Sequence, residues 1–246
     1  MVKKILILLF ILGLIVYLLF AMGHLNTPPS EERCKAVEVT LMENTKKGFI
    51  AAKEIKGILQ SKGLYPEGER MHDINTRLVE STLSKHPLIE HAECYKTSDS
   101  RIVIEIYQRI PILHVLSDRG EDYYIDTNGM HIVAPGMDAA YLPVVTGNVH
   151  PKTAGKSLLG LGLYLRDDAY WQGKIDQIHV TPGQSIELIP REEDFVVYLG
   201  TSHDLENKME RLRKFYERGL KHIGWDKYSR INIEFNNQII CTKKEK

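Results

Sequence analysis

The sequence contains little cysteine and no excess of charge of either sign. Its three cysteines, Cys34, Cys94 and Cys241, are an odd number, which cannot form a fully paired disulfide framework. We expect each to be a small buried side chain, although one disulfide stays open. Lysine plus arginine and aspartate plus glutamate both number 32. No basic surplus therefore indicates a nucleic-acid partner.

The sequence also lacks a complete catalytic or nucleotide-binding motif. Residues 155–157 read Gly-Lys-Ser, but His150 stands where a phosphate-binding loop needs its first glycine. In residues 86–91 two histidines and a glutamate have the wrong spacing for a zinc-protease helix, and Pro87 prevents a helix there. We therefore expect no enzyme activity, no metal or other cofactor, and no small-molecule substrate.

Long hydrophobic runs are absent except at the N-terminus. From Ile5 to Met22 no residue is charged. A helix of this length spans about 27 Å, close to the hydrocarbon thickness of a bilayer. We predict a single transmembrane helix over residues 5–25, which includes Leu12 and Leu19, after a cytoplasmic tail of residues 1–4.

Two lysines, Lys3 and Lys4, precede this run and favour a cytoplasmic N-terminus. The rest of the chain is then expected on the far side of the membrane, in the periplasm if this is an inner membrane. The alternative is a cleaved signal peptide with a small-residue site at residues 21–23. The run is longer than the usual signal core of about 7–15 residues, which favours a retained anchor.

After a polar linker over residues 26–34, the pattern predicts a small α+β domain over residues 35–115. A strand alternates at Val37, Val39 and Leu41, and a helix over residues 49–63 follows. A second helix is predicted from an Asp73 cap to Pro87. Its apolar residues are Ile74, Leu78 and Leu83, and strands over 88–96 and 101–113 complete a β-α-α-β-β order.

Residues 116–246 are predicted to form a mixed α/β domain with a mostly antiparallel sheet. Asn128-Gly129 indicates a hairpin, and residues 174–200 read as a meander. A helix is expected over 201–223, with Thr201 and Asp204 as a capping box. The overall fold class is therefore α+β with one transmembrane helix. Further expected elements are a strand at 142–147, a helix at 157–169 and two strands around Asn236-Asn237.

Short motifs in the right order resemble the FtsQ/DivIB cell-division family. The β-α-α-β-β unit resembles a POTRA domain, the polypeptide-transport-associated fold, and Arg109 and Pro111 fit the E-R-x-P segment that closes it. Gln108 replaces the glutamate of that pattern. Asp126 and Gly129 resemble the family's D-x-x-G hairpin. The step L-P-x-x-x-G is matched at Leu142, Pro143 and Gly147, and residues 231–243 resemble the closing strands. One departure is the glycine after the first strand, which is delayed to Gly48.

This resemblance implies a non-enzymatic divisome scaffold in the cell inner membrane. Its partners would be FtsL-like and FtsB/DivIC-like division proteins, and it would help control septal peptidoglycan synthesis. The family's terminal strands bind the FtsB/DivIC partner. The residues carried over or placed on that terminal strand are Phe235, Asn237, Gln238, Ile239, Ile240 and Lys243.

The residues give independent grounds for a binding role. If the last strand lies at a sheet edge, its unpaired N–H and C=O groups can accept a partner strand. The alternative is a membrane-anchored cell-envelope enzyme or glycan-binding protein. That alternative predicts a deep pocket, whereas the scaffold predicts an open strand edge with shallow grooves.

Overall fold

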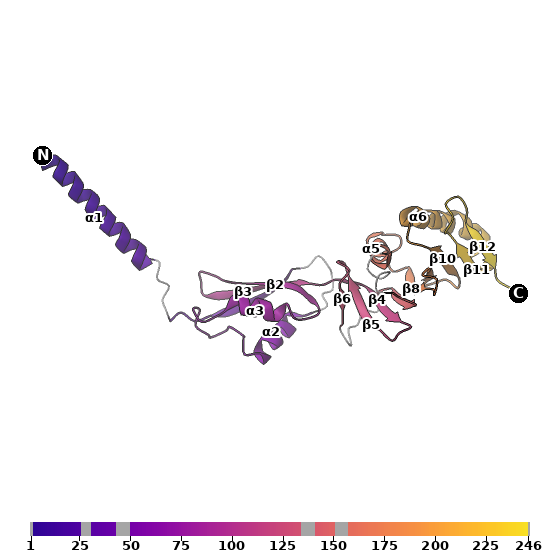
Figure 1. The fold of residues 1–246 in the computed structure, drawn as a ribbon, viewed down its shortest axis with the longest axis horizontal. Helices are drawn as coiled ribbons and strands as arrows, with labels where there is room; N and C mark the ends of the chain where they lie inside the picture. The colour runs from indigo at the N-terminus through magenta and orange to yellow at the C-terminus, as the bar shows by residue number, and fades with distance from the viewer. Residues whose placement is uncertain (1, 26–30, 43–49, 134–140, 151–156, 246) are drawn as a thin grey trace. The chain divides into compact units, whose positions relative to one another are not determined.

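The computed structural model describes residues 2–25, 31–42, 50–133, 141–150 and 157–245, and the chain divides into two compact units, Met1–Gln108 and Arg109–Lys246 (Figure 1). The glycine at 48 and the Gly-Lys part of residues 155–157 lie outside these ranges. Most of the linker predicted at 26–34 also lies outside them.

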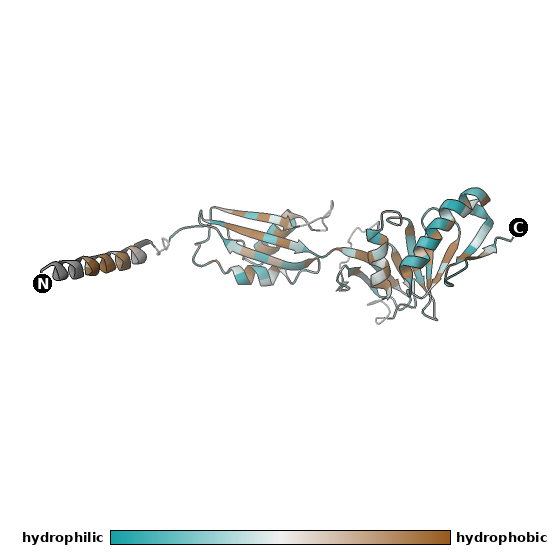
Figure 2. Ribbon diagram, turned by 90° about the horizontal axis from the view of Figure 1, so that it is seen from above, coloured by the Kyte–Doolittle hydropathy of each residue, from teal (hydrophilic) through white to brown (hydrophobic). Residues whose placement is uncertain are grey.

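Helix α1, Val2–Leu25, begins the first unit. It starts at Val2, and therefore includes Lys3 and Lys4 of the segment predicted as a cytoplasmic tail. Its described side chains run from Phe10 to Ala21, and all the large ones are exposed and hydrophobic (Figure 2). Among the described residues, no helix meets the length and hydropathy needed to cross a bilayer.

The rest of the first unit is a three-stranded sheet covered by two helices. The elements are β1 (Ala36–Met42), α2 (Ala52–Ser61), α3 (Thr76–Leu83), β2 (Ile89–Lys96) and β3 (Arg101–Gln108). The strand order is β1-β3-β2, with β1 parallel and β2 antiparallel to β3. Ile55, Leu59, Val79 and Leu83 of the helices pack on the alternating isoleucines of β3. The predicted β-α-α-β-β order is confirmed.

The second helix of this unit corrects two predictions. Its N-cap is Asn75, whose side chain accepts a hydrogen bond from the Leu78 amide at 3.1 Å. Asp73 lies in the preceding turn, where its amide donates to Arg70 O. Val79 and Leu83 are four residues apart and share the buried face, whereas Leu78 lies on a different side of the helix from Leu83 and is exposed.

The strand predicted over 101–113 is two strands in two different sheets. β3 ends at Gln108, and β4 (Pro111–Ser117) belongs to the second unit. The change of sheet occurs at Ile110, whose carbonyl accepts from Thr127 N beside β5. The first unit therefore ends at Gln108 rather than at Val115.

The second unit is built on a nine-stranded sheet of order β12-β11-β10-β9-β8-β7-β4-β5-β6. Three neighbouring pairs are parallel and five antiparallel, so the expected mostly antiparallel mixed sheet is confirmed. The remaining strands are β5 (Asp122–Asp126), β6 (His131–Ile132), β7 (Val144–Gly147), β8 (Ile175–Val180), β9 (Ile186–Pro190), β10 (Val196–Gly200), β11 (Tyr228–Asn232) and β12 (Ile240–Lys243).

Helices α5 (Leu159–Asp167) and α6 (Leu205–Phe215) share one hydrophobic cluster with the sheet. The chain continues from α6 through a π-helical turn η2 (Tyr216–Leu220), α7 (Lys221–Ile223) and a 3₁₀ turn η3 (Trp225–Lys227). The predicted capping box does not form. Asp204 has a left-handed backbone and no side-chain cap bond, and buried Lys208 instead donates to Leu199 O and Thr201 O.

Candidate functional site

Strand β12 forms one end of the large sheet, and within the described residues it pairs only with β11. The pairing is antiparallel, and Lys244 N donates to Lys227 O at 3.0 Å just beyond the strand. Successive N–H groups of a strand point to opposite edges. The N–H groups of Cys241 and Lys243 therefore face away from β11, toward the open edge.

The turn that leads into β12 is held by one arginine of α6. Arg211 Nη2 donates to Ile233 O at 2.8 Å and to Phe235 O at 2.9 Å. Asn232 Oδ1 also accepts from Glu234 N at 2.9 Å. These bonds order the approach to the edge strand. The role of Arg211 has no signal in the sequence, because nothing in a helical pattern reveals that an arginine reaches a distant turn.

The six residues predicted to bind a partner lie together at this edge but not in one strand. Ile240 and Lys243 belong to β12, whereas Phe235 and residues 237–239 lie in the turn before it. Phe235 and Ile240 are each 45% exposed, and Ile239 packs against the core. The strand is shorter than the Gln238–Lys243 segment expected, because the turn extends to Ile239.

An open groove of about 460 Å³ borders the same turn. Its helical wall carries Arg211, Lys214 and Arg218, and residues 236–239 form the opposite wall. The lining contains three cations and no carboxylate. Lys214 is paired with Glu210 at 3.4 Å, and the other two cations leave the groove basic. The groove is shallow and lies next to a strand edge that no other described strand covers.

The three thiols have the character of structural rather than reactive cysteines. All are free, with Cys34 and Cys94 buried and Cys241 half-buried. Burial and the nearby Glu80 raise the pKa of Cys94 to about 12, and burial raises the pKa of Cys34 and Cys241 as well. Reactive thiols need the opposite shift. In the described part of the chain, no three histidine, cysteine or acidic side chains gather as a metal site.

Two of the short sequence motifs meet in one buried ion pair. Arg109 Nη1 donates to Asp126 Oδ2 at 3.0 Å, and the Asp126 carboxylate is fully buried. Its other oxygen accepts from the amides of Asn128 and Met130 at 2.9 and 2.7 Å. This contact orders the β5–β6 hairpin, where Gly129 has a φ of +78°.

The other motif positions also have structural roles. The amide of buried Gln108 accepts from Ile50 N and donates to Ile50 O. A glutamate carboxylate could make the first of these bonds but could not donate the second. Gly147 has a φ of +90°, and a Cβ there would lie 2.2 Å from Val180 O. These residues build the fold rather than a site.

Comparison with known proteins gives matches to both units. Residues 110–242 match a family model described as FtsQ/DivIB, C-terminal related, and residues 32–107 match one described as a POTRA-like domain. A curated relative, cell division protein FtsQ of Rhodothermus marinus, is 20% identical over 211 residues. The alignment covers 76% of this chain and 72% of the relative.

Proposed function

The chain belongs to the FtsQ/DivIB family of cell-division proteins, and on this premise we propose that it is a non-enzymatic, membrane-anchored divisome scaffold. Its partners would be FtsB/DivIC-like and FtsL-like division proteins, and through them it would help control septal peptidoglycan synthesis. It would reside in the inner membrane as a single-pass protein, with a cytoplasmic N-terminus and a periplasmic C-terminal domain.

The observation that carries this proposal is the open edge of β12. An unpaired strand edge is a template for a partner strand, in which main-chain hydrogen bonds supply affinity and side chains supply specificity. Phe235 and Ile240 offer exposed apolar surface at that edge. The basic groove beside the turn favours a partner that carries acidic side chains near its docking strand.

The proposed anchor is α1. Its described side chains are exposed and apolar, including Leu12 and Leu19 at 58% and 66% exposure. In water such a surface would be unfavourable, whereas lipid accepts it because the helix satisfies its own backbone hydrogen bonds. Ile5 and Met22, whose side chains lie outside the described set, complete the apolar run in the sequence.

Proline substitution at Lys243 tests the strand-docking mechanism. Its N–H faces the open edge, so proline removes a donor that β11 does not use. We expect the full-length Lys243→Pro protein, purified from membranes, to recover about tenfold less of the FtsB/DivIC-like partner, since the lost hydrogen bond and the proline ring both oppose strand pairing.

Lys243→Ala is the matched control, because it removes the same exposed side chain but keeps the N–H. It should lose much less partner than Lys243→Pro does, because main-chain hydrogen bonds supply most of the affinity. Both variants should have unchanged melting temperatures. Equal recovery by Lys243→Pro and Lys243→Ala would refute docking along β12.

A further inference from the structure

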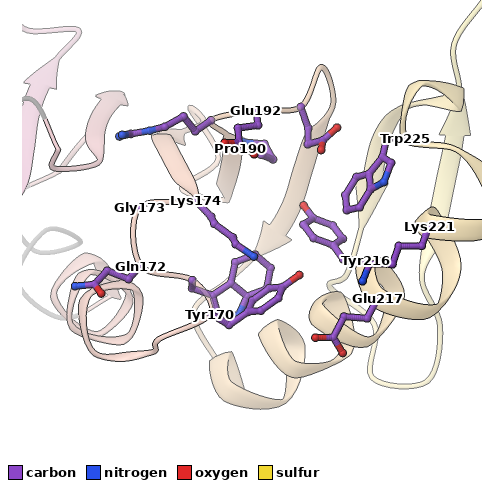
Figure 3. Close-up of a pocket in the computed structure, with 13 residues that line it drawn as sticks. Tyr170, Gln172, Gly173, Lys174, Pro190, Glu192, Tyr216, Glu217, Lys221 and Trp225 are labelled. Atoms are coloured by element: carbon purple, nitrogen blue, oxygen red, sulfur yellow. The ribbon is translucent and has the colours of Figure 1, made fainter.

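A second candidate site lies in the C-terminal unit and does not include β12. It is a cavity of about 480 Å³, which is the size of small-molecule sites in proteins. Figure 3 shows three groups of side chains around it. They come from residues 170–174 before β8, from residues 190–193 at and beyond the end of β9, and from residues 216–225 after α6.

Aromatic rings form much of the wall. Tyr216 makes edge contacts with Trp171, Phe195 and Trp225, at centroid separations of 5.6, 5.8 and 5.1 Å. Tyr170 contacts Trp171 edge-on at 5.0 Å. Tyr216 begins the π-helical turn, an irregularity that is frequent at functional sites.

Two buried polar groups of this wall have no partner among the described residues. They are the indole N–H of Trp171, 1% exposed as a residue, and the hydroxyl of Tyr216, 5% exposed as a residue. In Figure 3 the Tyr216 hydroxyl points into the space between the three groups. An unpaired buried donor costs about 1–3 kcal/mol, so a ligand or water that supplies acceptors is favoured here.

The charges around the cavity balance. Arg191 is paired with Asp176 at 3.2 Å, and Glu217 is paired with Arg213 at 3.2 Å, so four charged lining residues remain. These are Lys174 and Lys221 against Glu192 and Glu193, and none forms an ion pair within the described ranges.

Lys174 and Glu193 each interact with neighbouring groups of the chain. Lys174 Nζ lies 3.3 Å from the centroid of the Tyr170 ring. Burial and the neighbouring carboxylates Glu192 and Asp194 raise the pKa of Glu193. The cavity therefore offers both hydrogen-bond donors and acceptors, and it has no net charge that would favour an ion.

From this geometry we propose that the cavity binds a carbohydrate, that is, a neutral ligand rich in hydroxyl groups. Sugar hydroxyls accept from Trp171, Tyr216 and the lysines, and they donate to Glu192 and Glu193. The C–H faces of a sugar ring pack on the aromatic wall. Lys174 and Lys221 are exposed side chains at the rim of the cavity, where they can donate to the outer hydroxyls of the ligand.

Tryptophan fluorescence reads this site directly, because Trp171 and Trp225 are the only tryptophans in the sequence and both line the cavity. The full-length chain, in a detergent without a sugar head group, is titrated with the trisaccharides of N-acetylglucosamine and of glucose. We expect a saturable change in emission with at least one of them.

Tyr216→Phe removes only the hydroxyl, and it should weaken that binding about tenfold. Its melting temperature should be unchanged or higher, because an unpaired buried hydroxyl is lost. Tyr228→Phe, the same change outside the cavity lining, should bind as the unmodified chain does. If Tyr216→Phe does not fold, Lys174→Met at the exposed rim replaces it and should also weaken binding.

Three results would overturn the proposal. The first is no saturable response to either trisaccharide, which would mean that water satisfies the two donors. The second is equal affinity in Tyr216→Phe, or in Lys174→Met where it replaces that variant, and in the unmodified chain. The third is a response to N-acetyltyrosinamide alone, which would assign the cavity to a peptide side chain.

Discussion

Asp126 shows how much structure can depend on a single carboxylate. It has no solvent exposure and accepts three hydrogen bonds, one from Arg109 and two from backbone amides of the following turn. A buried charge is tolerated only when such partners compensate it. The two motifs that contain Arg109 and Asp126 are 17 residues apart in the chain, yet they form one structural unit.

We expect Asp126→Ala to lower the free energy of unfolding of the C-terminal unit by about 3–5 kcal/mol, because it leaves Arg109 and two amides without their acceptor. Urea denaturation followed by tryptophan fluorescence measures this, since both tryptophans lie in that unit. Asp122→Ala on the same strand is the control. Its side chain is 68% exposed and, among the described residues, bonds His114, so the substitution should cost at most about 1 kcal/mol. Equal losses in both variants would contradict this account.

The connection from α3 to β2 depends on a neutral histidine. His86 N donates to Leu83 O at the helix end, and His86 O accepts from Ile89 N at the start of the strand. The imidazole Nδ1 accepts from Leu88 N at 3.3 Å, which requires an unprotonated nitrogen. Burial lowers the pKa of His86 below its ordinary value of 6.5, and the nearby Glu54 opposes this only in part.

The first unit should therefore lose stability as the pH falls below 6.5. The unfolded chain binds a proton there while the native state does not, so acid favours unfolding until the lower native pKa is reached. Hydrogen exchange of α3 and β2, corrected for the intrinsic rate and compared at about pH 7 and pH 5, measures the loss. His86→Gln should remove part of this dependence, whereas His72→Gln at an exposed site should not. A pH response identical in all three proteins would rule out His86 as its source.

At the scale of the whole molecule, the described side chains of α1 are exposed and apolar. The apolar side chains of α1 from Phe10 to Phe20 are between 47% and 74% exposed. Both hydrophobic clusters are composed of residues after α1. None of the described side chains of α1 belongs to either cluster, which agrees with the anchor proposed for this helix.

Charges placed in the middle of α1 test the anchor. We expect a Leu12→Arg and Leu19→Arg double variant to be released from membranes by alkaline carbonate, because each arginine costs about 2.5–3.5 kcal/mol in a bilayer. The unmodified chain and Leu12→Ile should stay in the membrane fraction. Retention of the double variant would argue against a spanning helix.

Local patterns in the sequence predict most of the elements and several of their neighbours. Alternation at residues 102–106 predicts a half-buried strand, and Asn128-Gly129 predicts the β5–β6 hairpin, because both signals come from backbone geometry within a few residues. Other local predictions are wrong for local reasons. Asp73 and Asn75 are both good N-caps, and the structure uses Asn75. Leu78 and Leu83 are five residues apart and do not share a helical face, and Leu78 is exposed.

Long-range contacts could not be derived in this way. Whether Ile110 continues one sheet or enters another depends on Thr127, and whether Arg109 is buried depends on Asp126. The cavity also brings together three segments that are far apart in the chain. No sequence motif links its two tryptophans or its glutamates.

Periodicity and turn residues are sufficient to give the α+β class and most of the succession of helices and strands along the chain, since they act between near neighbours. The position of β12 at the sheet edge, the buried Asp126 and the aromatic cavity depend instead on packing between residues far apart in the chain. Such contacts have no local signal, because their energies arise only when the whole domain has folded.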